Sequence, residues 1–187
     1  MARIGLKYLR YSVLDENDAV TTPSTFGKAV DCKVSIEKNN AELYADDGIA
    51  ESDYSFKKGT IALTVDEDDD TVFAEVLGHT ISSGTGTTAG EMVRNAEDVA
   101  PYVAIGRILT KVVNGVKKYK VEFLHKVKFT EPNTEEKTKG ESIEFGTSAI
   151  EGTIHTLANG DWSKTKTFTV YTEASAYLDG LLTANAS

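Results

Sequence analysis

The sequence predicts a mainly β fold, an antiparallel β-sandwich or barrel with one short flanking α-helix. Apolar and polar residues alternate with a period of two through much of the chain, as in strands with one buried and one solvated face. One Asn-Gly pair lies between two long alternating segments, which is the pattern of a β-hairpin. Clear helical spacing of apolar residues occupies one short segment. With 187 residues, the chain is expected to form a single domain over residues 1–187.

The first clear alternation runs through residues 30–37, and a second runs through residues 60–65. In each segment every other residue is apolar, so one face of the strand can be buried while the other stays solvated. Both segments are therefore predicted to be strands. Their apolar positions are Val30, Cys32, Val34, Ile36, Ile61, Leu63 and Val65.

A short helix is expected over residues 70–77, where four apolar residues fall on one helical face. The acidic run 66–70 suits the start of this helix, because carboxylates accept hydrogen bonds from the free amides of the first turn. Gly78 suits the position just after the last turn, which favours a left-handed conformation. The apolar residues of the face are Val72, Phe73, Val76 and Leu77.

The strongest single prediction is a hairpin of residues 102–113 and 116–129 around Asn114-Gly115, since both turn residues tolerate positive φ. With strict alternation, the second strand of this hairpin has one apolar face and one basic face. The apolar face holds Tyr119, Val121, Phe123, Val127 and Phe129, and the other holds Lys118, Lys120, Glu122, Lys126 and Lys128.

The remaining elements are less clearly marked. Further strands are predicted around residues 143–145, 152–157 and 166–171, and a second short helix near residues 174–182 is weakened by Gly180. Residues 87–99 fit either a weak helix or a short strand. The Gly-rich segment 84–90 has neither the spacing of a dinucleotide-binding fingerprint nor the Gly-Lys-Ser/Thr of a P-loop, so we expect a flexible loop there.

Residues 37–58 form a polar connection between the two strands at 30–37 and 60–65. A long connection without a core of its own is usually either functional or disordered. Leu43 and Tyr44 give this one apolar anchors that a simple linker does not need. Asp46-Asp47-Gly48 is predicted to form a tight turn within it, because Asp and Gly tolerate the left-handed conformation.

Charge is distributed unevenly along the chain. The net charge is -9; residues 1–100 carry 9 Lys and Arg against 19 Asp and Glu, whereas residues 101–187 carry 11 against 10. An acidic chain of this kind is unsuited to general nucleic-acid binding, which needs clustered positive charge. No apolar run is long enough to span a membrane, and the N-terminus lacks the apolar region of a secretory signal. We expect a cytosolic origin and no membrane contact.

The residue types that carry catalysis or bind metals are sparse. His79, His125 and His155 are far apart in the sequence, and none has a second His or Cys at i+3 or i+4. His125 falls on the apolar side of its strand, where a hydrogen-bonded core or interface imidazole is expected. Because Cys32 is the single cysteine in the sequence, an intrachain disulfide is excluded. Its place in an alternating strand indicates a buried structural thiol. The acidic run 66–70 lacks the Gly and Glu of an EF-hand loop. We expect no cofactor, no metal site and no enzymatic activity.

Several segments, taken in order, resemble the major tail proteins of long-tailed phages and prophages of Gram-positive bacteria. The resemblance covers nearly the whole chain. It rests on residues 4–8 (Ile-Gly-Leu-Lys-Tyr), 43–48 (Leu-Tyr-Ala-Asp-Asp-Gly), 77–80 (Leu-Gly-His-Thr), 100–106 (Ala-Pro-Tyr-Val-Ala-Ile-Gly), 129–132 (Phe-Thr-Glu-Pro), 138–145 (Thr-Lys-Gly-Glu-Ser-Ile-Glu-Phe) and 150–152 (Ile-Glu-Gly).

This resemblance implies a structural virion protein whose copies form hexameric rings that stack into the tail tube. The tube would conduct DNA into the host without binding it specifically, and tape measure and tail terminator proteins would be its further partners. The protein would be made in the host bacterial cytoplasm and reside in the virion tail. The fold implied is similar to the tubes of contractile tails and type VI secretion systems. Some relatives carry a C-terminal immunoglobulin-like domain, for which we expect no room here.

Two groups of residues are expected to act in assembly. The resemblance implies that residues 37–58 are an extended loop that reaches from one ring to the next. The five lysines within residues 117–128, in a chain with an acidic other half, suggest that a basic strand face contacts a neighbouring subunit; a freely solvated face is the alternative. The alternative function is a carbohydrate- or protein-binding β-sandwich module with its site in the loops. The residues concerned are Leu43, Tyr44, Asp46, Asp47 and Gly48 for the loop and Lys118, Lys120, Lys126 and Lys128 for the subunit contact.

Overall fold

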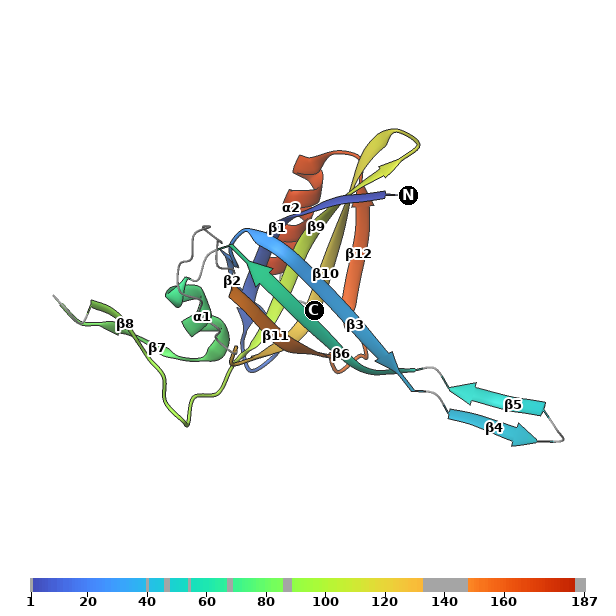
Figure 1. Cartoon of the computed structure of the whole chain (residues 1–187), viewed down its shortest axis with the longest axis horizontal. Helices are drawn as coiled ribbons and strands as arrows, with labels where there is room; N and C mark the ends of the chain where they lie inside the picture. Colours follow the sequence, from blue (N-terminus) through green and yellow to red (C-terminus); the bar gives the residue numbers. More distant parts are fainter. Residues whose placement is uncertain are drawn as a thin grey trace, which may run out of the picture.

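A computed structural model describes residues 2–39, 41–45, 48–53, 55–66, 69–85, 89–132 and 148–183. Within these ranges the protein is mainly β, and two helices flank the strands (Figure 1). The strands are β1 (Ala2–Leu14), β2 (Val20–Thr25), β3 (Ala29–Lys38), β4 (Ala41–Ala45), β5 (Gly48–Asp53), β6 (Phe56–Val65), β7 (Thr80–Ser83), β8 (Ala89–Val93), β9 (Tyr102–Val113), β10 (Val116–Thr130), β11 (Ser148–His155) and β12 (Ser163–Phe168). The helices are α1 (Asp70–Leu77) and α2 (Tyr171–Thr183).

The main sheet is antiparallel, with the strand order β2-β1-β9-β10-β11-β6-β3. β12 joins it as a branch on β10. β10 is 15 residues long and therefore pairs with two strands along one edge, with β12 over residues 119–124 and with β11 over residues 126–130. The predicted strands at 30–37, 60–65 and 152–157 correspond to β3, β6 and β11. The segment predicted at 166–171 is β12, although Tyr171 already begins α2.

The sheet bends so that β3 and β6 cross over the half formed by β1, β9 and β10 (Figure 1). The main apolar core lies between these two layers and is closed by α1. Burial of this many apolar side chains is the main force that stabilises the fold. The arrangement is compatible with the predicted β-sandwich. The largest core side chains with almost no exposure are Tyr11, Phe26, Phe129, Leu9, Ile61, Leu63, Ile105, Ile150 and Ile154.

A second apolar cluster covers the opposite face of β9 and β10, where α2 packs. Ala174, Leu178 and Leu182 of α2 are fully buried there. The expectation of a single flanking helix is therefore wrong, whereas the second helix predicted near residues 174–182 is confirmed and is 13 residues long. Gly180 costs some helix propensity, but burial of the apolar side of the helix outweighs that cost.

The start and end of α1 agree with the sequence prediction. Asp69 is the N-cap, and its side chain accepts a hydrogen bond from the Thr71 amide at 2.9 Å. Gly78 ends the helix in the left-handed conformation, with φ of 80°, as glycine readily does. The predicted hairpin is also confirmed, since Asn114 and Gly115 join β9 to β10 with φ of 51° and 78°.

Two small hairpins extend from this body (Figure 1). β4 and β5 pair with each other as a separate two-stranded sheet and continue the β3–β6 ribbon outward; we call residues 41–53 the arm. β7 and β8 form the second hairpin, so the alternative of a weak helix at 87–99 is wrong and part of the expected loop at 84–90 is strand. The strand predicted at 143–145 lies outside the described residues.

Candidate functional site

A cleft of about 500 Å³ opens between β3 and the strands β9, β10 and β12. Val34, Ile61, Leu124 and Trp162 supply apolar walls, and charged side chains line the rest. A cleft of this size with a few convergent polar groups is the usual form of a binding site in a protein. It is therefore the candidate functional site.

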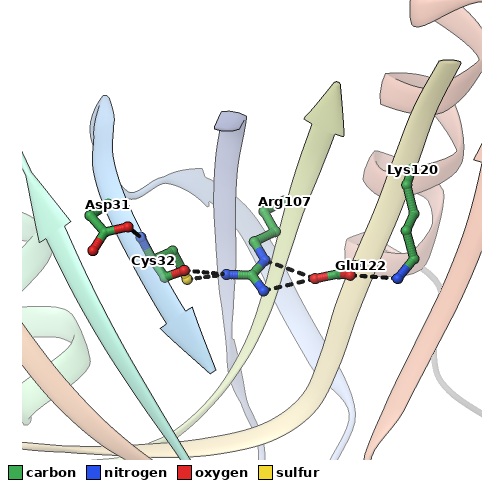
Figure 2. Close-up of polar contacts among 5 residues, drawn as sticks. All are labelled: Asp31, Cys32, Arg107, Lys120 and Glu122. Carbon is green, nitrogen blue, oxygen red and sulfur yellow. Dashed lines mark hydrogen bonds and ion pairs between the residues drawn. The ribbon is translucent and has the colours of Figure 1, made fainter. Parts of the chain in front are cut away.

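A row of charged side chains crosses the cleft between β3 and β10 (Figure 2). Arg107, which is only 9% exposed, places Nη2 at 2.7 Å and Nε at 3.1 Å from one carboxylate oxygen of Glu122. The other carboxylate oxygen of Glu122 accepts a hydrogen bond from Lys120 Nζ at 2.6 Å. Arg107 Nη1 donates to the backbone oxygen of Cys32 at 3.4 Å and contacts its Sγ atom. Arg107 thus joins three strands of the two layers.

These contacts determine which groups are charged in the cleft. Burial raises the pKa of the Glu122 carboxyl, but hydrogen bonds and charge from Lys120 and Arg107 outweigh burial and hold the pKa below its usual value. Burial raises the pKa of the Cys32 thiol, and the opposing effect of Arg107 is smaller. Cys32 therefore favours the neutral thiol over the nucleophilic thiolate, but it is half-buried rather than buried as predicted.

The four candidate lysines of β10 do not share one face, so that prediction is wrong. Up to Leu124, β10 pairs with β9 without interruption, but between Leu124 and Val127 the register shifts by one residue. Such a β-bulge moves every later side chain to the other face. Lys120 lies opposite Leu109, on the face of the cleft, whereas Lys128 lies opposite Tyr102, on the other face.

Lys118 and Lys120 on one face, and Lys126 and Lys128 on the other, consequently have different surroundings. Lys120 lines the cleft, and Lys118 lies two residues further along the same face of β10. Lys126 forms an ion pair with Asp18 at 2.5 Å and lies 4.2 Å from the ring centre of Tyr102, close to Lys128 on the outer face. All four side chains are half-buried rather than fully exposed.

The candidate assembly residues of 37–58 belong to the arm. Leu43 and Tyr44 are in β4 and Gly48 begins β5, while Asp46 and Asp47 lie outside the described residues. The base of the arm is fixed at Asn39, whose amide donates to the Ser55 backbone oxygen and whose side chain donates to Ser55 Oγ, each at 2.8 Å.

A second polar cluster surrounds His79, directly after α1. Nδ1 lies 2.7 Å from Asp98 and Nε2 lies 3.0 Å from Glu131, which also pairs with Arg94 at 3.4 Å. The hydrogen bond to Asp98, supported by Glu131, raises the pKa of His79 despite burial. Because each ring nitrogen faces a carboxylate, these contacts favour the protonated imidazole, which can donate to both. The cluster joins the end of β10 to the base of the β7–β8 hairpin.

The other candidate ligands are not arranged as a metal site. Among the residues that the structure describes, no group of three His, Cys, Asp or Glu side chains could hold a metal ion. His125 is 4% exposed, and burial lowers its pKa. In the described part of the chain its Nε2 atom has no hydrogen-bond partner, so the expected hydrogen-bonded imidazole is wrong at this atom. Of the acidic run, Asp69 caps α1, and residues 67 and 68 lie outside the described residues.

Arg107 was not among the predicted site residues, although the sequence contains a signal for it. Arg107 interrupts the apolar segment 103–109, and the two-residue turn at Asn114-Gly115 places it directly opposite Glu122. Neither helix in the described ranges is long and apolar enough to cross a membrane.

No protein-family model matches the chain, and no curated protein matches it.

Proposed function

We propose that this protein is the tail tube subunit of a long-tailed phage or prophage, a structural protein that assembles into hexameric rings stacked as a tube. In this role the protein has no catalytic activity, and DNA passes through the tube into the host without specific binding. The protein is made in the host bacterial cytoplasm and resides in the virion tail. Tape measure and tail terminator proteins are its further partners.

The observation that carries the proposal is the arm. Two strands extend away from the body and pair with each other, and an isolated two-stranded hairpin has little stability of its own in water. The sequence nevertheless places Leu43, Tyr44 and Ile49 in it. An arm of this kind gains stability when it binds another surface, as a connector between rings does.

The edges of the sheet and the charge distribution also support assembly. β2 and β3 end the order of the main sheet, and strands at sheet edges can pair with strands of another copy. Closed rings need two unlike surfaces on each copy that fit one another. The acidic residues 1–100 and the near-neutral residues 101–187 differ in charge, as two unlike surfaces can.

A second candidate function is a carbohydrate- or protein-binding β-sandwich module. The cleft favours it, because Trp162 and the Arg107–Glu122 pair together offer an apolar wall and directional polar groups. In that case the chain would bind its ligand as an isolated copy, and Trp162 would report binding through its fluorescence.

Sedimentation velocity over a wide range of protein concentration distinguishes the two functions. A tube subunit should form a six-copy species and then larger species in multiples of six. A binding module should sediment as one small species at every concentration, and its Trp162 fluorescence should change with a glycan or peptide ligand. The second pattern would overturn the proposed function.

A further inference from the structure

The face of the main sheet that lines the cleft becomes cationic toward the β9–β10 turn. Lys111 of β9 lies directly opposite Lys118 of β10. On the other side of β9, Lys111 lies opposite Arg3 of β1. Three basic positions therefore share one row of the strand register across three strands. Like charges directly opposite one another in a sheet destabilise it.

The rows next to this one add to the positive charge. Lys120 and Arg107 follow on the same face, because side chains two residues apart in a strand share a face. Glu122 is the acidic residue between them, and it already pairs with both. We call Arg107, Lys111, Lys118 and Lys120 the cationic face; with Glu122 its net charge is +3 in a chain whose net charge is -9.

The arm has the opposite composition. Residues 41–53 include five acidic residues and no Lys or Arg: Glu42, Asp46, Asp47, Glu51 and Asp53. The same segment contributes Leu43, Tyr44 and Ile49, and the cleft beside the cationic face has apolar walls. Charge and apolar composition therefore match between the arm and the cationic face.

These two surfaces lie apart within one copy. The arm leaves the body at the lower right of Figure 1, whereas the β9–β10 turn lies at the upper right. Two copies related head to tail do bring them together, and a contact between unlike surfaces of this kind repeats from copy to copy.

We propose that the arm of one copy docks on the cationic face of a second copy and extends into its cleft. This inference rests on the proposed function, in which it identifies the surface that receives the arm between stacked rings. Docking supplies carboxylates to the row of Lys111 and Lys118 and removes the repulsion within it. The charge pattern orients the copies, because complementary charge mainly determines the register and the rate of association.

Charge exchange tests the proposal. Lys111→Glu with Lys118→Glu should weaken self-association in sedimentation velocity by about tenfold or more, and Glu42→Lys with Glu51→Lys should do the same. The four substitutions combined in one chain should restore association to near the original level. Lys126→Gln with Lys128→Gln, on the other face of β10, is the matched control for Lys111→Gln with Lys118→Gln and should have a smaller effect.

Crosslinking of the full-length protein gives a readout that does not depend on ring formation. A carbodiimide joins a lysine amine to a carboxylate as an amide with loss of water. In a mixture of isotopically labelled and unlabelled copies, mass spectrometry should find mixed-label links between Lys111 or Lys118 and the arm. Circular dichroism of each variant excludes misfolding as the cause of lost association.

The outcomes separate the two proposals. Links and rescue without closed six-membered rings support docking and overturn the proposed function. Rings and tubes without links or rescue overturn docking and leave the proposed function standing. A duplex DNA shift that is abolished by Lys111→Glu with Lys118→Glu, while self-association stays unchanged, overturns docking in favour of nucleic acid. Absence of any association overturns both.

Discussion

Arg107 and Glu122 occupy directly opposite positions of β9 and β10, and their charged groups meet at 2.7 Å inside the cleft. Arg107 also contacts Cys32 on β3, so the pair connects the two layers of the sheet at the point where the apolar core gives way to charge. Removal of a charged partner from such a place leaves the other charge with little water and no counterion.

Glu122→Gln should therefore lower the free energy of unfolding by about 2–4 kcal/mol. Urea denaturation monitored by Trp162 fluorescence measures this change. The double variant Arg107→Met with Glu122→Leu should recover most of the loss, since neither charge remains to be solvated. A Glu122→Gln variant as stable as the original protein would show that the pair is solvated and does not hold the layers together.

The contact of α2 with β9 depends on Gly106. A Cβ atom at this position would come within 2.1 Å of Leu178 Cδ1. Gly106→Ala should force α2 away from the sheet and cost about 1–3 kcal/mol in a thermal or urea unfolding experiment. Gly180→Ala is the matched control. An added methyl there meets open space inside a helix, so it should stabilise the protein by about 0.5–1 kcal/mol. Equal effects of the two substitutions would contradict the packing.

His79 should make stability depend on pH. Its pKa in the folded protein is raised above the ordinary value of 6.5 by Asp98 and Glu131, so folding favours the protonated form. The resulting stability is fully present below about pH 6.5 and is lost as the pH rises through the folded pKa. Urea titrations between about pH 5.5 and 8.5 should show this loss in the original protein.

The variant His79→Gln should lack that pH-dependent step, because glutamine has no proton to lose over this range. Asp98 stays ionised throughout, since hydrogen bonds from the Asn95 amide and from His79 lower its pKa. A step of the same size in both proteins would assign it to another group.

The sequence was sufficient to predict elements whose determinants are local. Asn114 and Gly115 fix a two-residue turn and hence the register near it, and Asp69 with Gly78 marks both ends of α1. The bulge after Leu124 has no comparable signature, because both faces of β10 are covered by apolar clusters. Phe123 faces the α2 cluster before the bulge and Val127 faces the main core after it, so the apolar positions keep one phase in the sequence. The bulge is the reason why a single basic face on β10 was predicted wrongly.

β1 was not predicted for a related reason. Its pairing with β9 shifts register between Lys7 and Arg10, and Tyr8 there has a φ of 57°, so the apolar positions before and after Tyr8 follow different phases. The cleft could be predicted only in part. The turn sets Arg107 opposite Glu122, but their meeting with Cys32 depends on how β3 crosses β9, which is a property of the whole fold.

The arm should be dispensable for folding and necessary for stacking. In the described part of the chain β4 and β5 pair with each other and not with the main sheet. Replacement of residues 41–50 by a short Gly-Ser linker should leave the thermal unfolding temperature within about 2–3 °C of the original. The variant should fail to form long tubes. Tubes of normal length would show that another surface connects the rings.

Electron microscopy of the purified full-length protein in negative stain, at high concentration, tests the proposed tube subunit most directly. The proposed function predicts hollow rings with six-fold symmetry and stacks of such rings, which become longer as the protein concentration increases. Featureless small particles at every concentration would contradict it.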